Sequence, residues 1–302
     1  MRLTNPWKQS ANAITMKITK TSTSSLIGLT VLALLSPWRT TEATAASATG
    51  ADKMQPENAA DADQSLREKT QNPVSDLISV PLQNNFDFGI GPKNATRWVL
   101  NVQPVIPFKL TEDWNLITRT IVPIIDQESP APGVPSVFGL GDINPSFFIA
   151  PSKPSSFIWG AGPTFTLPTG TDSLLTSGKW AAGPAAVVLK MKEPWVFGVL
   201  ANHQWDFAGW GDRPYNRTLI QPFVNFNLPN GWYLNTAPIM LADWEISSGD
   251  KWLVPLGGGV GKIHRFGKLP VNIQLGAYYN VVKPDNGPDW QLRFQIQFLL
   301  PK

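Results

Sequence analysis

The chain has 302 residues with 16% charged and 11% aromatic side chains, 28 prolines, 13 tryptophans, two histidines and no cysteine. Disulfide scaffolds and thiol catalysis are therefore excluded, and His203 and His264 alone cannot supply the full ligand set of a zinc site. A hydrophobic share of 42% is ordinary for a folded chain, so disorder throughout is excluded as well. We expect no bound metal.

The first 48 residues have the pattern of an exported protein. A short basic stretch at residues 17–20 precedes an apolar run over residues 26–35, which is too short to span a membrane as a helix. Two A-x-A cleavage patterns follow within residues 43–48. We therefore expect residues 1–48 to be a cleaved signal peptide, with an uncleaved amphipathic anchor as the alternative.

This segment also carries the excess positive charge, and its start is open between Met1 and Met16. Against one acidic residue, Glu42, it contains the basic residues Arg2, Lys8, Lys17, Lys20 and Arg39. Its removal takes the formal net charge from +3 to a value near zero, so the mature chain lacks the basic footprint of nucleic-acid binding. We expect no nucleic-acid partner.

Residues 49–75 are polar, rich in alanine and free of aromatic side chains, so they cannot bury enough apolar area to fold alone. We interpret them as a flexible periplasmic leader. A short helix around residues 59–69 and docking as a plug are both compatible with the sequence.

From Asp76 onward the hydrophobic pattern changes to a period of two, which predicts β-strands. In residues 290–300 the apolar side chains Trp290 and Leu292 begin a series that alternates with Gln291 and Arg293. Similar alternation predicts about twelve strands of roughly ten residues. They are expected at 77–88, 97–109, 114–125, 141–151, 157–168, 179–190, 195–207, 217–228, 232–245, 252–266, 270–283 and 290–300.

The connections between these strands alternate between short and long. Short ones are expected at 110–113, 152–156, 191–194, 229–231 and 267–269, and long ones at 126–140, 169–178 and 208–216. An even number of antiparallel strands with this alternation is typical of an outer-membrane β-barrel, with short periplasmic turns and longer extracellular loops. The sequence therefore predicts an all-β fold, with residues 76–302 forming a transmembrane antiparallel barrel in the outer membrane of a Gram-negative bacterium.

Tryptophans gather at the ends of the predicted strands, where the indole ring would reach the headgroup level of a membrane. The expected membrane-interface belts contain Trp98, Trp114, Trp180, Trp195, Trp205, Trp232, Trp244, Trp252 and Trp290. The alternative is that these rings form the core of a soluble β-sandwich.

Several prolines fall inside the predicted strands, where each removes a hydrogen-bond donor. They are Pro104, Pro145, Pro163, Pro184, Pro222 and Pro238. We expect β-bulges to accommodate them.

Several ordered motifs between residues 72 and 302 carry a family resemblance. They are Asn72-Pro73 with LISVP at 77–81, QPVIP at 103–107, DWNLITR at 113–119, LPTGT at 167–171, NHQW at 202–205, PLGGGVG at 255–261 and DWQLR at 289–293. Together they resemble the Gram-negative outer-membrane family labelled MetA-pathway of phenol degradation, whose members are often mislabelled neuromedin U. The resemblance implies a barrel related to channels for hydrophobic compounds such as fatty acids and aromatics.

The expected partners are outer-membrane lipid, a small-molecule solute and the barrel-assembly machinery. The chain ends in Phe298, two leucines, Pro301 and Lys302, without the terminal aromatic residue of many barrels. Recognition by that machinery would therefore depend on Phe298 or on residues before it.

If the apolar faces meet lipid, the other faces line the lumen with amides and two arginines. The pore-lining candidates are Asn101, Gln103, Asn115, Arg119, Asn202, Gln204, Gln221, Asn225, Gln274, Arg293 and Gln295. Arg119 and Arg293 would favour anions, and Asp206, Asp243 and Glu245 could oppose that preference at the mouth. The alternative is that these groups satisfy one another in a filled lumen, with the arginines in ion pairs.

Four aromatic residues share the inner parity: Phe148, Phe223, Tyr233 and Tyr278. They either form a constriction for apolar solutes or fill the lumen. A passive channel or transporter for small, hydrophobic or aromatic solutes is the function that these patterns and the resemblance favour, and a structural or surface-binding barrel is the alternative.

Catalysis is a minor alternative, because an outer-membrane hydrolase needs a hydroxyl group within hydrogen-bond reach of an imidazole. His203 has outward parity, but Trp205 occupies the next outward position and a cross-strand partner is left open. We expect His203 to join the belt beside Trp205. No catalytic residue and no cofactor are expected, since the glycine run 257–261 lacks the context of a dinucleotide loop.

Overall fold

The computed structural model describes residues 56–153, 157–247, 249–267 and 269–300, so the predicted signal peptide lies outside the described residues. Helix α1 spans Pro56–Gln71 and the short 3-10 helix η1 spans Pro229–Gly231. The strands are β1 (Ile78–Ile90), β2 (Ala95–Val102), β3 (Val105–Lys109), β4 (Trp114–Gln127), β5 (Val137–Leu140), β6 (Asn144–Pro151), β7 (Ile158–Thr166), β8 (Lys179–Lys192), β9 (Trp195–Gly209), β10 (Asn216–Asn227), β11 (Trp232–Thr236), β12 (Met240–Asp243), β13 (Trp252–Phe266), β14 (Leu269–Val282) and β15 (Trp290–Leu300).

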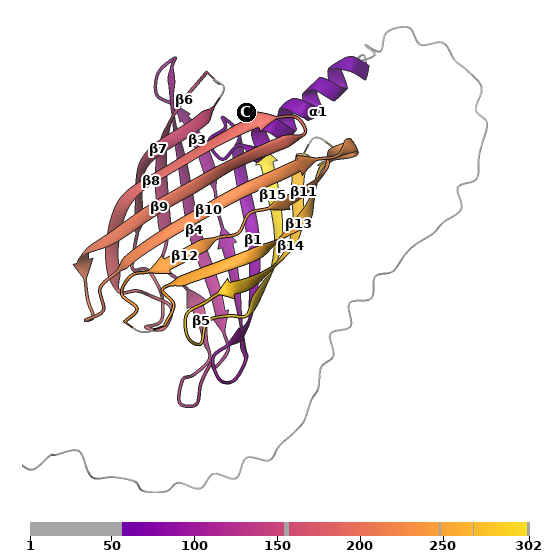
Figure 1. Ribbon diagram of the computed structural model, residues 1–302. Helices are drawn as coiled ribbons and strands as arrows, with labels where there is room; N and C mark the ends of the chain where they lie inside the picture. Colours follow the sequence, from indigo (N-terminus) through magenta and orange to yellow (C-terminus); the bar gives the residue numbers. More distant parts are fainter. Residues whose placement is uncertain (1–55, 154–156, 248, 268, 301–302) are drawn as a thin grey trace, which may run out of the picture. The chain divides into compact units, whose positions relative to one another are not determined.

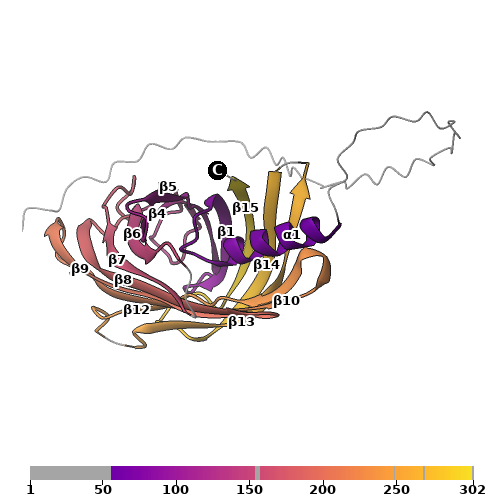
Figure 2. The same cartoon turned by 90° about the horizontal axis from the view of Figure 1, so that it is seen from above.

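These strands form one antiparallel sheet that closes on itself (Figure 1). The last strand, β15, pairs with β1 from Ile78↔Leu300 to Phe88↔Trp290, and β9 pairs with β10, which completes the ring. Seen from above, the strands curve round into a ring (Figure 2). Closure gives each strand two hydrogen-bonded neighbours, which is the condition for a sheet to cross a bilayer.

Fifteen segments make twelve barrel strands, because three of the barrel strands are interrupted. β2 and β3 both pair with β4, as do β5 and β6, while β11 and β12 both pair with β10. The predicted all-β antiparallel barrel is therefore confirmed. We call the end with the connections at 110–113 and 193–194 the short-turn end, and the end with loop 167–178 the loop end.

The expected bulges at the prolines are wrong. Register shifts occur between Asp87 and Ile90, Trp180 and Ala181, and Val254 and Pro255. Two prolines, Pro104 and Pro238, instead lie at strand interruptions, which spares the ladder a missing donor. The other four prolines lie within β6, β7, β8 and β10.

Pro163 and Pro184 face each other across β7 and β8. The ladder on the far side of β8 skips this point, since pairing with β9 stops at Ala182 and resumes at Ala185 in the same register. The seam between β6 and β7 has only the pairs Ser146↔Thr164 and Ile149↔Ala161. The N–H groups that Pro163 and Pro184 lack are therefore missing from the seams with β6 and β9, while the ladder between β7 and β8 stays continuous.

Helix α1 lies within the segment that the sequence assigns to a periplasmic leader. Its last residue, Gln71, is buried, and its Nε2 donates a hydrogen bond to Asn227 Oδ1 (2.9 Å) at the end of β10. Three residues later, Val74 is 6% exposed and packs into an apolar cluster inside the barrel. No helix among the described residues is long and apolar enough to cross a bilayer.

The inner face of the wall is divided between apolar and polar side chains. Ile117, Phe148, Val187, Leu189 and Leu200 form the centre of the apolar cluster on β4, β6, β8 and β9. Across the barrel from this cluster, β15 and β1 present mainly polar side chains to the lumen. Gln297 lies opposite Pro81, Gln295 opposite Gln83, and Arg293 opposite Asn85. The cluster fills part of the lumen, so the remaining space lies beside the polar strands.

Tyr233 on β11 is fully buried and fills a space that a glycine leaves open on β13. A Cβ atom at Gly261 would lie 2.2 Å from Tyr233 Cζ. The Tyr233 hydroxyl donates to Asn272 Oδ1 (2.7 Å) and accepts from Gln274 Nε2 (2.5 Å) on β14. The tyrosine thus joins three neighbouring strands from inside the barrel.

We expect Gly261→Ala to destabilise the barrel by about 1–3 kcal/mol, the usual cost of overpacking, because the new methyl group would overlap the Tyr233 ring. Unfolding in urea of protein refolded in lipid measures this change. In a Tyr233→Leu background the same substitution should cost clearly less. Equal penalties in both backgrounds would show that the ring is not the obstacle.

Candidate functional site

The barrel encloses two cavities. The outer cavity, toward the loop end, has a volume of about 670 Å³, and its lining includes Asn144, Thr166, Gln204 and Arg217. The inner cavity, toward the short-turn end, has a volume of about 200 Å³. A cavity of the first size is within the range of small-molecule sites, and one of the second size holds a few waters or one small ring.

A chain of hydrogen bonds runs along the wall of the inner cavity from β4 to β15. Arg119 Nη2 donates to Gln103 Oε1 (2.6 Å), and Gln103 Nε2 donates to Gln83 Oε1 (2.9 Å). Gln83 Nε2 and Arg293 Nε both donate to Asn85 Oδ1, at 3.0 and 3.2 Å. We call these five residues the amide arc.

Arg293 is held more firmly than Arg119. It is 7% exposed, donates from Nη1 to Ala237 O (2.8 Å) and from Nη2 to Gln291 Oε1 (2.9 Å), and lies 4.6 Å from the centroid of the Tyr278 ring. Neither Arg119 nor Arg293 forms an ion pair within the part of the chain that the structure describes. The nearby carboxylate of Asp87 is bound instead by Arg97 (2.8 Å) and by Gln291 (2.7 Å). Arg119 therefore brings a positive charge into the lumen without an acidic partner among the described residues, whereas the charge of Arg293 is partly offset by Asp87.

The predicted pore-lining residues all fall on the inner face by register. Gln103, Arg119, Gln221, Asn225, Gln274, Arg293 and Gln295 line the inner cavity, and Asn202 and Gln204 line the outer cavity. Asn101 faces Gln83, and Asn115 faces Ala150, without lining either cavity. A role of these side chains in passage of a solute stays a prediction.

The four aromatic candidates occupy different surroundings. Phe223 lines the inner cavity, whereas Phe148 is 3% exposed within the apolar cluster. Tyr233 and Tyr278 are buried between strands, and the Tyr278 hydroxyl accepts from the Ala237 backbone N–H (3.3 Å). Phe148, Tyr233 and Tyr278 are thus packed against neighbouring side chains, whereas Phe223 faces the cavity.

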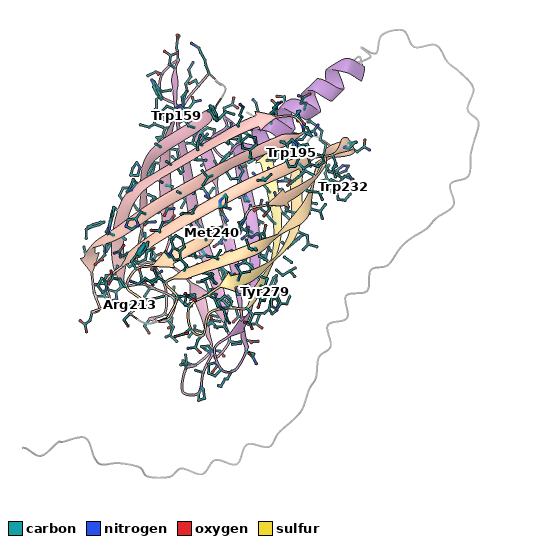
Figure 3. All side chains as sticks on the ribbon, in the orientation of Figure 1. Trp159, Trp195, Arg213, Trp232, Met240 and Tyr279 are labelled. Atoms are coloured by element: carbon teal, nitrogen blue, oxygen red, sulfur yellow. The ribbon has the colours of Figure 1, made fainter. Side chains whose placement is uncertain are left out.

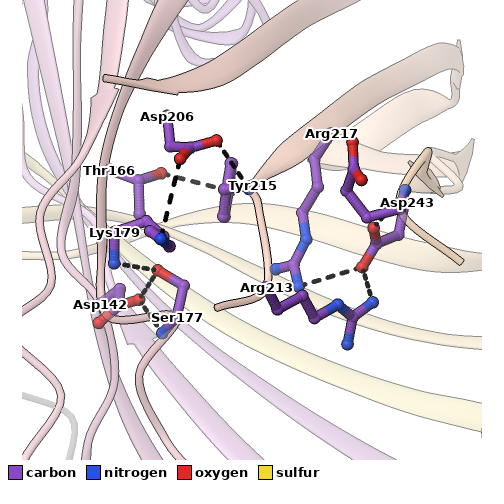
Figure 4. A network of polar contacts seen from close by, with 10 residues as sticks. Asp142, Thr166, Ser177, Lys179, Asp206, Arg213, Tyr215, Arg217 and Asp243 are labelled. Atoms are coloured by element: carbon purple, nitrogen blue, oxygen red, sulfur yellow. Dashed lines mark hydrogen bonds and ion pairs between the residues drawn. The ribbon is translucent and has the colours of Figure 1, made fainter. Parts of the chain in front are cut away.

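At the outer cavity, acidic and basic side chains are paired (Figure 4). Asp243 accepts from Arg213 (2.7 Å) and Arg217 (3.3 Å), and Asp206 lies 4.0 Å from Lys179. The Asp206 carboxylate also accepts from the Tyr215 backbone N–H (2.8 Å). The carboxylates of Asp206 and Asp243 therefore each lie beside a basic side chain, and an opposing negative charge at the mouth, to which Glu245 would also contribute, stays a prediction.

Asp142 fixes the longest described loop, residues 167–178, across the wall of the outer cavity. Its carboxylate accepts from the Ser177 hydroxyl and backbone N–H, both at 2.6 Å, from Thr176 Oγ1 (2.7 Å) and from the Gly170 N–H (3.2 Å). Leu174 and Leu175 from the same loop line the cavity. The sequence missed this residue, because its partners lie on a loop without a periodic pattern.

Residues 69–73 and Ser75 line the inner cavity at the short-turn end, together with Leu77 just before β1 and Ser79 in β1. Gln71 Oε1 and Asn235 Oδ1 have no hydrogen-bond partner among the described residues and are buried at this cavity. The end of α1 and the segment before β1 thus form a floor of the cavity, held by Gln71 and Val74.

Tryptophans mark both ends of the outer wall. Trp159, Trp195 and Trp232 lie at the short-turn end, with Arg213 and Tyr279 toward the loop end (Figure 3). Lys262 Nζ lies 4.7 Å from the centroid of the Trp232 ring. At the loop end Trp244 packs edge to face against Trp252, with their centroids 6.0 Å apart. Trp98, Trp114, Trp180, Trp205 and Trp290 also lie on outward-facing positions.

On the outer face, His203 contacts Trp205 with ring centroids 4.1 Å apart, as expected. The structure also supplies the cross-strand hydroxyl that the sequence left open. His203 Nδ1 lies 2.7 Å from Thr218 Oγ1, and the same oxygen accepts from Trp244 Nε1 (2.8 Å). No group of three or more potential metal ligands occurs among the described residues.

The barrel has an apolar outer wall with tryptophans at both ends, closed backbone pairing and an interior lined partly by polar side chains. These are the features of an outer-membrane β-barrel. The fold is that of a transmembrane β-barrel of the Gram-negative outer membrane.

Comparison with known proteins agrees with this class. No protein-family model and no curated protein matches the chain. Among solved structures, an outer membrane channel from Pseudomonas putida F1 is similar, with a TM-score of 0.55 and 16% identity over 74% of this chain and 94% of that one. The NanC porin has a TM-score of 0.48 and 11% identity over 73% of this chain and 100% of that one.

A Salmonella typhi outer membrane phospholipase has a TM-score of 0.40 and 12% identity, over 74% of this chain and 91% of that one. Of these three structures, the Pseudomonas channel has a TM-score above 0.5 and supports the fold, and at this identity the likeness says nothing about a solute.

We expect Asp142→Ala to release loop 167–178. Loss of the hydrogen bonds to a charged acceptor should speed amide hydrogen exchange of residues 170–178 by at least about tenfold. Mass-spectrometric hydrogen exchange measures this change. Asp172→Ala is the matched control, because the Asp172 side chain accepts only from the Leu174 N–H (2.8 Å) among the contacts described. Unchanged protection in Asp142→Ala would contradict the role of this carboxylate.

Proposed function

We propose that the protein is a passive outer-membrane channel for small solutes. The observation that carries the proposal is the hollow interior: an outer cavity of about 670 Å³ and an inner cavity of about 200 Å³, both bounded by inward-facing polar side chains. Amide and guanidinium groups hydrate such a space, whereas a barrel with a purely structural role has no need of it.

The channel is narrow at its short-turn end. Residues 69–75 and the apolar cluster around Leu200 reduce the space there, so passage is restricted to small molecules or requires movement of the segment before β1. Outer-membrane lipid around the tryptophan belts, and the barrel-assembly machinery during biogenesis, are the proposed partners of the wall.

The proposed solutes are small molecules with apolar or aromatic character. The resemblance to the MetA-pathway family suggests this class, and apolar side chains beside both cavities support it. Leu200 and Phe223 line the inner cavity, and Ile121, Leu174 and Leu219 line the outer one. The channel would thus offer apolar contact on one side and hydrogen bonds on the other.

One contact favours a second function, that of an outer-membrane hydrolase. The Thr218 hydroxyl lies within hydrogen-bond reach of His203, which is the pairing that an activated nucleophile needs. The imidazole has no carboxylate or amide partner among the contacts described, and the hydroxyl is shared with Trp244. A binding role at the membrane interface therefore accounts better for this group, and we propose a non-enzymatic protein.

Planar-bilayer recordings test the channel. The refolded mature chain is expected to show small discrete conductance steps, and deletion of residues 49–75 is expected to enlarge them, because the floor of the inner cavity is removed. Deletion of residues 49–63, which leaves the cavity-lining part in place, is the matched control. Silence of both deletion variants, with folding verified by heat-modifiable gel mobility, would exclude a channel.

Hydrolysis is tested with fluorogenic short-chain and phospholipid esters. We expect no activity above background and no difference between wild type and Thr218→Val, which removes the hydroxyl but keeps the shape. Turnover that Thr218→Val abolishes would overturn the non-enzymatic proposal.

A further inference from the structure

The inner cavity has a strong imbalance of charge. Its lining contains Lys69, Arg119 and Arg293 and not one carboxylate from the described residues. Lys69 is engaged outside the cavity by Asp76 (3.0 Å), but the two arginines have only neutral hydrogen-bond partners. Asp87, which does not line the cavity, acts electrostatically on Arg293, whereas Arg119 has no acidic partner among the described residues. A buried cation without a counterion is costly, so the cavity favours an anion beside Arg119.

The hydrogen bonds of the amide arc point in a direction that adds to this preference. The amide oxygens of Gln103, Gln83 and Asn85 are all occupied by donors from within the arc. A guanidinium group has five N–H donors, and Arg119 uses one of them in the contacts described. The arc therefore presents spare donors and no spare side-chain acceptors, which suits a ligand group rich in acceptors. The two unpartnered oxygens at this cavity, Gln71 Oε1 and Asn235 Oδ1, do not belong to the arc.

The opposite side of the inner cavity carries two apolar side chains among amides. β9 and β10 lie across the ring from β1 and β3, and they contribute Leu200 and Phe223 to the same lining, beside Gln221 and Asn225. A volume of about 200 Å³ exceeds that of a cavity of about 150 Å³ that accepts benzene. The inner cavity is thus large enough for one ring between these two apolar side chains and the arginines.

Basic side chains outnumber acidic ones in the described lining of the outer cavity. Arg97, Arg217 and Lys251 line it together with the carboxylates of Asp142 and Asp243, and Asp243 is bound by two arginines. The outer cavity therefore does not oppose the entry of an anion from the loop end.

From these observations we infer that the inner cavity is a binding site for small organic monoanions: a carboxylate joined to an apolar body of about one aromatic ring. The carboxylate accepts from the unused donors of Arg119 and lies near Arg293, and the apolar body contacts Leu200 and Phe223. This inference rests on the proposed channel, whose solutes it narrows from apolar molecules in general to those with a single negative charge.

Titration calorimetry of the refolded full chain tests the site directly, with sodium benzoate as probe and benzamide as its neutral match in size and shape. Benzoate is expected to bind at least about tenfold more tightly, the effect of one charge-assisted hydrogen bond. Equal binding of the two compounds, or binding of neither, would overturn the inference.

Variants locate the binding group. Arg119→Gln should weaken benzoate binding by about tenfold or more and leave benzamide unchanged, and Arg119→Lys should keep part of the preference because it keeps the charge. Lys153→Gln, at an exposed pair with Asp113, is the control for loss of one positive charge and should bind as wild type. Wild-type binding by Arg119→Gln would overturn the inference, and Arg293→Gln provides a second test if Arg119→Gln fails to fold.

Liposome flux measurements on the same proteins distinguish failure of the proposed channel from failure of the anion site. Wild-type liposomes that take up benzoate and benzamide equally would leave the proposed channel standing and overturn the anion site. Tight benzoate binding that is lost in Arg119→Gln, without any flux, would establish the site and overturn the channel.

Discussion

Closure of the backbone hydrogen-bond ladder is the constraint on which the rest of this structure depends. In hydrocarbon an unpaired N–H or C=O has no water to bond, so every strand must have two neighbours, and β15 must return to β1. Once the ring is closed, strict alternation assigns each side chain to lipid or to the lumen. Outward-facing side chains then meet only lipid, so the choice between apolar, polar and charged side chains is left to the inner positions and the loops.

The inner positions solve two problems at once. Part of the lumen is filled, by the cluster of Ile117, Phe148 and Leu189 and by Val74 from the segment before β1. The rest is left open and lined with amides, of which Gln103, Gln83 and Asn85 have oxygens already bonded to donors, and the arginines are its dominant charges. Apolar packing on one side and hydrogen-bonded amides on the other give the remaining cavity a defined shape, and the arginines give it a positive charge.

The sequence allowed the strands, their number and the parity of the amides to be predicted, because a period of two over ten residues is a strong local signal. It did not reveal how the lumen is filled. β8 is apolar on both faces, so alternation could not show that Val187 and Leu189 point inward. Nor did it reveal Asp142, the contact of Gln71 with Asn227, or the His203 and Thr218 pair, since each joins residues far apart in sequence. The predicted bulges at the prolines were wrong, because a strand can also accommodate a missing donor by an interruption or by a gap in the ladder that keeps the register.

The facing prolines on β7 and β8 have a consequence for how the wall holds together. With few backbone pairs between β6 and β7, that seam is joined by side chains on both of its faces. Ser146 and Thr164 share a hydroxyl hydrogen bond of 2.8 Å inside, and Phe147 meets Phe165 edge to face outside, with centroids 6.1 Å apart. Side-chain contacts weaken with heat and denaturant in a way that a continuous ladder within lipid does not. This seam is therefore where the cylinder should first part when the barrel unfolds.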